Sequence, residues 1–158
     1  MGITNEIALD PVLNIKLQEV RLDVDNEILT LAAKEDILNA VIVKTDDGYK
    51  MITEIGYMEM GKDIKIAFAP GEICTDLIYG GASLTPEGSL KGEAFGGKTL
   101  TEIFGKDVVI FGLANDAIGY IIPDNDYAMA LAFGHYHETL SLGEKTASIL
   151  SKAYENIK

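Results

Sequence analysis

Hydrophobic and polar residues alternate over residues 12–24 (VLNIKLQEVRLDV), and this period of two predicts one long β-strand. Two further β-rich runs, at 41–45 (VIVKT) and 49–60 (YKMITEIGYMEM), are separated by Asp46-Asp47-Gly48. Because aspartate and glycine tolerate the positive φ of a tight turn, these two runs are predicted to form a β-hairpin.

Shorter apolar segments predict the remaining strands. The segment IKIAFA at 64–69 is expected to be a buried strand that ends at Pro70-Gly71-Glu72. The continuous apolar run DVVIFGLA at 107–114 is typical of a strand covered on both faces. Residues 80–97 are rich in glycine and serine and show no period, which predicts a long loop, either functional or mobile.

Caps and spacing predict three helices. The first begins after Asp25 as N-cap and runs to about Leu38, and the second covers residues 73–79. The third follows a capping box formed by Ser141 and Glu144. The apolar faces of the first and third helices are expected at Ile28, Leu31 and Ala32, and at Ala147, Leu150, Ala153 and Ile157. The chain is predicted to be a single α+β (mixed α/β) domain over residues 1–158, with helices packed on a largely antiparallel or mixed sheet.

The charge balance argues against two classes of binding partner, nucleic acids and anionic membranes. The net charge is −12, from 25 acidic and 13 basic residues, so the chain lacks the clustered cations that nucleic-acid binding requires. The same charge disfavours an anionic membrane surface. No apolar run reaches the roughly 18 residues of a membrane span, and the first residues lack the pattern of a signal peptide. A soluble protein, cytoplasmic by default, is expected.

Two local patterns are compatible with a nucleotide site or a metal site but do not establish either. Residues 92–99 (GEAFGGKT) match a P-loop, but the upstream residues do not predict a buried strand, and a glycine-rich surface loop is favoured over nucleotide binding. His135 and His137 would share one side of a strand and could grip a metal, yet they are the only histidines. A pair of exposed or satisfied histidines beside a functional Tyr136 is favoured. Cys74 is expected to be a small buried hydrophobe.

Three segments, in order, resemble the later part of the catalytic domain of the neutral/alkaline ceramidase family. They are APGE at 69–72, GLANDAIGY at 112–120, and YHET at 136–139 with the later Gly143. The resemblance extends from about Leu22 to Ile157. Similarity to this family implies a zinc-dependent amidase that cleaves N-acyl amide bonds of lipids.

The resemblance also implies roles for individual residues. Glu72 and Tyr120 would be zinc ligands, and Tyr136 would orient or polarise the substrate amide. A carboxylate and a phenol are hard oxygen donors that could complete a site whose other ligands are imidazoles. Asn115, His135 and His137 are expected beside the substrate.

The chain lacks some of the residues that the family's active site needs, and this predicts a partner that supplies them. The family's two zinc-binding histidines and its active-site serine belong to an earlier half, and residues 1–60 contain neither a histidine nor the Gly-Asp-x-Ser-Pro motif. The chain is therefore expected to be inactive alone, and to bind zinc only with an N-terminal half of the same domain, or else to self-associate. A stand-alone binding or interaction module is the alternative, and a P-loop nucleotide binder is a minor one.

Overall fold

The computed structural model describes residues 5–35, 37, 42–128 and 135–158. The strands are β1 (Leu13–Asp23), β2 (Ile42–Thr45), β3 (Gly48–Met60), β4 (Ile64–Phe68), β5 (Glu72–Ile73), β6 (Val108–Phe111) and β7 (Tyr120–Ile121). The helices are α1 (Glu27–Lys34), α2 (Thr75–Tyr79), α3 (Leu100–Phe104), α4 (Tyr136–Thr139) and α5 (Thr146–Ile157), with 3-10 turns η1 (Ala82–Leu84) and η2 (Asp124–Asp126). The α+β prediction is confirmed.

The main sheet has the strand order β1-β3-β4-β6, and β2 pairs with β3 beside it. The β1–β3, β2–β3 and β3–β4 pairs are antiparallel, whereas β4 and β6 run parallel. The predicted hairpin is confirmed, with Thr45 opposite Gly48. Beyond the ends of β4 and β6, the chain forms a second, two-stranded parallel sheet from β5 and β7.

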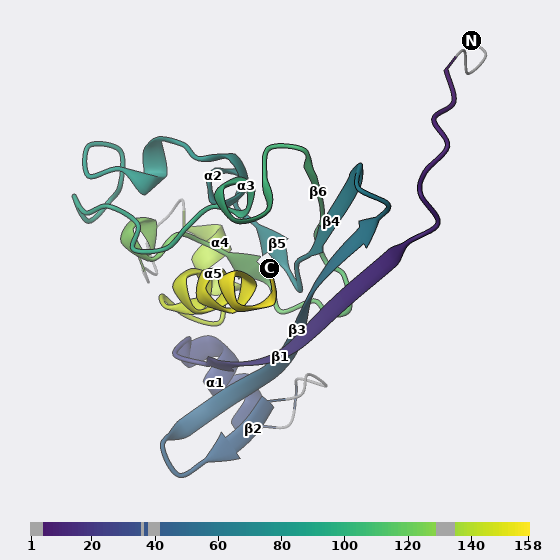
Figure 1. Cartoon of the computed structure of the whole chain (residues 1–158). Coiled ribbons are helices and arrows are strands. Elements are labelled where there is room, and N and C mark those ends of the chain that lie inside the picture. Colours follow the sequence, from purple (N-terminus) through teal and green to yellow (C-terminus); the bar gives the residue numbers. More distant parts are fainter. Residues whose placement is uncertain (1–4, 36, 38–41, 129–134) are drawn as a thin grey trace.

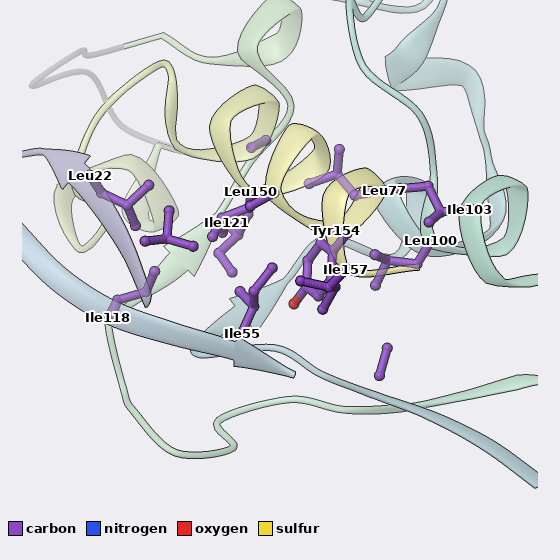
Figure 2. Close-up of a cluster of buried hydrophobic side chains, with 14 of the residues drawn as sticks. Leu22, Ile55, Leu77, Leu100, Ile103, Ile118, Ile121, Leu150, Tyr154 and Ile157 are labelled. Carbon is purple, nitrogen blue, oxygen red and sulfur yellow. The ribbon is translucent and has the colours of Figure 1, made fainter. Parts of the chain in front are cut away.

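The helices α2, α3 and α5 lie on one side of the main sheet (Figure 1). Figure 2 shows Ile55 of β3 and Leu22 of β1 facing Leu150, Tyr154 and Ile157 of α5. The ring of Tyr57 stacks on Phe104 with centroids 4.3 Å apart. All four predicted apolar positions of α5 are buried, so the core lies between the sheet and these helices.

Several predicted local details are wrong. The N-cap of α1 is Asn26 rather than Asp25, and the helix ends at Lys34; Leu38 lies outside the described residues. Ile28 and Leu31 are 47% and 60% exposed, because α1 turns a different side, that of Leu29, toward the core. Ile73 belongs to β5, so the second helix begins only at Thr75.

The capping box at Ser141 does not form, and α5 begins four residues later than that box requires. Contacts with other parts of the chain hold this segment in a different conformation. The carbonyl of Ser141 accepts a hydrogen bond from Asn26, and the carboxylate of Glu144 pairs with Lys91 and Lys145. A capping box forms instead at α3, between Thr99 and Glu102.

The prediction that β6 is covered on both faces is also wrong for this chain. Val108 is buried under the helices, but Val109 and Phe111 are 47% and 48% exposed on the opposite face. Both faces of β6 are therefore apolar, but the described residues cover only one of them.

Candidate functional site

Glu72 and Tyr120 are register partners in the small parallel sheet. Side chains alternate along a strand, so both point to one side, opposite to the side taken by Ile73 and the buried Ile121. The Glu72 carboxylate is near enough to the Tyr120 hydroxyl to raise the pKa of that hydroxyl. Two residues that lie 48 positions apart in the sequence therefore present a carboxylate and a phenol at one point of the surface.

Two glycines allow this close approach. A Cβ on Gly71, next to Glu72, would lie 2.3 Å from the carbonyl oxygen of Gly119. Gly119 itself has φ +91°, and a Cβ there would lie 1.8 Å from the carbonyl oxygen of Leu140. Only glycine fits such positions without backbone movement. The Pro-Gly-Glu and Gly-Tyr segments thus have a structural reason for their glycines.

An aromatic cluster surrounds Tyr120. Its ring centroid lies 4.5 Å from that of His137 and 5.9 Å from that of Tyr136, both in edge-to-face arrangements. The rings of Tyr136 and His137 are 5.8 Å apart. The structure thus gathers Glu72, Tyr120, Tyr136 and His137, and the Tyr136 side chain remains exposed.

His135 and His137 do not lie on a strand, the placement on which the metal hypothesis depended. His135 is the N-cap of α4 and His137 lies in its first turn, so a strand's alternation does not place their rings on one side. Instead His135 Nδ1 lies 2.8 Å from Oε1 of the buried Glu138. This carboxylate fixes the His135 ring, and the spacing of three residues was a local signal for the pair.

These residues border a pocket of about 520 Å³. One part of its wall is polar and includes Glu72, Tyr120, Asp126, His135, His137 and Glu138. The other part is apolar and includes Ile73, Leu90, Ile121, Ile122 and Pro123. A pocket with converging polar groups at one side and an apolar wall suits a ligand that has both a polar group and a hydrocarbon part.

The glycine-rich loop at 80–97 supplies part of that wall and is held in place by η2. Asn125 Nδ2 donates to the carbonyls of Ser83 and Glu93, both at 2.8 Å. The backbone N–H of Leu90 donates to Asp126 at 2.9 Å. The loop is therefore a fixed part of the pocket, a role that only contacts between distant segments could show.

Two side chains that line the pocket, Tyr120 and Cys74, have raised pKa values. The nearby Glu72 carboxylate raises the pKa of Tyr120 above its ordinary value, so the free site holds a neutral phenol. Burial raises the pKa of Cys74, which also lines the pocket. Because the thiolate is the nucleophilic form, Cys74 is a poor nucleophile.

Two oxygen donors of the candidate site lie next to each other. Glu72 and Tyr120 are adjacent oxygen donors that open on the pocket, whereas a structural or catalytic zinc takes three or four protein ligands. Within the described ranges, His, Cys, Asp and Glu side chains form no group of three or more that could hold a metal. The remaining ligands would have to come from outside the described part of this chain.

Asn115 lies apart from this pocket. It has a positive φ of 69° in the connection between β6 and β7, and its amide donates to Glu54 of β3 at 3.0 Å. The structure thus does not bring it to the other predicted site residues.

The P-loop hypothesis lacks its structural context. No strand leads into residues 92–99, because all of residues 74–99 are described and contain only turns and short helices. The helix that follows, α3, has five residues, and its first amides are capped by Thr99 and Glu102. The Lys98 ammonium pairs with Glu155 at 2.5 Å.

In comparisons with models of protein families, with curated proteins and with solved structures, the chain matched none. Among the described residues, no helix is long and apolar enough to cross a membrane.

Proposed function

We propose that this chain is the Glu- and Tyr-bearing part of a zinc-dependent amidase site of the ceramidase type, inactive until another segment supplies imidazole ligands and the serine. The observation that carries the proposal is the Glu72–Tyr120 register pair, which opens on the pocket. Motifs separated by 48 residues meet side by side, as a shared metal site would require.

Each residue of the cluster has a distinct role in this proposal. Glu72 provides a carboxylate and Tyr120 a phenol as oxygen ligands. Tyr136, exposed and 5.9 Å ring to ring from Tyr120, orients the substrate amide. Zinc held there would supply Lewis-acid activation of a water and of the amide carbonyl. The His135–Glu138 pair fixes the helix that carries Tyr136.

The pocket also supports an N-acyl amide substrate. Its polar side lies at Glu72 and Tyr120, where an amide would sit, and its apolar wall includes Leu90, Ile121 and Pro123. Burying methylene groups against such a wall contributes about 0.8 kcal/mol each. A substrate with a hydrocarbon chain next to its amide is therefore favoured over a fully polar one.

Metal analysis tests the proposal. The chain is mixed with the first half of a ceramidase-type catalytic domain, which carries the histidines and the Gly-Asp-x-Ser-Pro motif, and zinc is measured after gel filtration. We expect about one zinc per complex and little in the chain alone, because two ligands fix a metal poorly. Glu72→Gln and Tyr120→Phe should each lower zinc affinity at least tenfold, and Glu87→Gln in the exposed loop is the control. Full zinc occupancy of the single chain that survives Glu72→Ala would refute the ligand assignment.

A further inference from the structure

The main sheet has a second apolar face, opposite to the helices. The register aligns its side chains in rows across four strands. We call this surface the outer face; it consists of Leu13, Ile15 and Leu17 of β1, Met58 and Met60 of β3, Ile64, Ile66 and Phe68 of β4, and Val109 and Phe111 of β6.

Much of the outer face is exposed in this chain, although Ile66 within it is buried. Leu13, Ile15 and Leu17 are 59%, 54% and 53% exposed. At Gly56, between them and β4, the side chains of Leu17 and Phe68 close over the missing Cβ and continue the apolar surface. Figure 1 shows the helices on the other side of these strands. Contiguous apolar patches beyond a few hundred Å² mark interaction sites on soluble proteins.

The sequence of the strands matches a sheet with two covers. A sheet with one solvated face shows apolar residues alternating with polar ones, whereas all of β6 is apolar and β4 is apolar except for Lys65. The helices cover one face only. A second layer is therefore missing from the described chain.

Charge argues against a second copy as that layer. Each copy carries a net charge of −12, so two copies face to face would repel. At one margin of the outer face, Glu19 and Glu54 lie directly opposite each other in the register. Like charges in this position destabilise a sheet, and Arg21 and Asn115 offset them only from the side. A cationic side chain on the occupant would neutralise this pair.

The outer face also leads to the site. Asn115, at its margin, belongs to the connection that ends at Tyr120. A groove of about 450 Å³ runs from Glu72 to Val109 and is also lined by Leu113. A layer on the outer face that reaches past β6 would therefore come next to Glu72.

We propose that the outer face is the docking surface for the histidine-bearing segment of the proposed amidase, which presents an apolar layer with a basic margin toward Glu19 and Glu54. This inference rests on the proposed function and names where its missing half binds.

The test uses the same first half of a ceramidase-type catalytic domain as probe, with binding measured by calorimetry and sedimentation velocity. We expect a 1:1 complex with the wild-type chain. Ile15→Lys should raise its Kd at least tenfold, because a charge would be buried in an apolar interface. Lys16→Gln, on the opposite side of the same strand, should change Kd less than twofold. Urea unfolding is the check that the Ile15→Lys variant still folds.

The Glu72→Gln variant distinguishes docking from zinc binding, because it should still form the complex but should no longer bind zinc. A complex that is sensitive to Ile15→Lys but never takes up zinc supports the docking surface and removes the proposed function. Stoichiometric zinc with a Kd insensitive to Ile15→Lys overturns the docking surface alone. So would absence of a complex, a homodimer that persists with excess probe, or Ile15-dependent binding to phosphatidylcholine vesicles in its place.

Discussion

Asn26 is a fully buried side chain that joins α1 to the end of α4 and to the turn after it. Its amide oxygen accepts hydrogen bonds from the N–H groups of Ile28 at 2.9 Å and Leu29 at 3.3 Å, as an N-cap does. Its amide nitrogen donates to three backbone carbonyls, those of Glu138 at 3.1 Å, Thr139 at 3.1 Å and Ser141 at 2.8 Å. This turn includes Leu140, whose carbonyl accepts from the Tyr120 N–H at 3.1 Å. Asn26 therefore holds in place the backbone segment to which Tyr120 of the candidate site is hydrogen-bonded.

Replacing Asn26 by alanine should cost about 3 kcal/mol of unfolding free energy. Loss of the cap contributes about 1 kcal/mol. The two amide protons serve three carbonyls, and leaving these unpaired contributes about 2 kcal/mol more. With a urea m-value of about 2 kcal/mol/M for a chain of this size, the midpoint should fall by about 1.5 M.

Asn26→Asp separates the two contributions. It keeps the cap acceptor but turns a carboxylate toward the three carbonyls, so at pH 7 it should destabilise at least as much as alanine. The neighbouring carbonyls and burial would raise the folded-state pKa of this carboxyl above its unfolded value. Its destabilisation should therefore be full at high pH and shrink as the pH falls through the raised pKa.

Urea unfolding followed by circular dichroism, at pH 7 and pH 5, measures both variants. Asn14→Ala, at an exposed position of β1, is the control and should change stability by no more than about 0.5 kcal/mol. A loss below about 1 kcal/mol for Asn26→Ala, or an Asn26→Asp variant as stable as wild type at pH 7, would refute this account.

Three more outcomes follow from single contacts. Tyr154→Phe should cost about 1–2 kcal/mol in urea unfolding, because the buried hydroxyl donates to the Phe68 carbonyl at 2.8 Å, and an unchanged midpoint would contradict that bond. Gly71→Ala should separate β5 from β7 and lower zinc uptake by the mixed halves even though both ligands remain, whereas unchanged uptake would show that the backbone adapts. Hydrogen bonds from Lys91 and Lys145 lower the pKa of Glu144, so carboxyl NMR should show the Glu144 pKa rising toward 4.5 in Lys91→Met; the small stabilisation from this pair is present above that value and lost as the pH falls through the lowered pKa.

Local patterns determined most of the fold. The alternation in β1 and the turn residues before Gly48 predicted the strands and the hairpin, because side-chain period and turn chemistry act within a few residues. The helical spacing of Leu150 and its neighbours likewise identified the buried face of α5.

Tertiary contacts decided what local patterns could not. The Ser141 capping box does not form, and the Ser141 carbonyl accepts a hydrogen bond from Asn26, 115 positions away. The pocket wall at Leu90 depends on η2, more than 30 residues away. Long-range hydrogen bonds and shared burial carry free energies as large as local propensities. Only the folded chain shows which of the two prevails at each position.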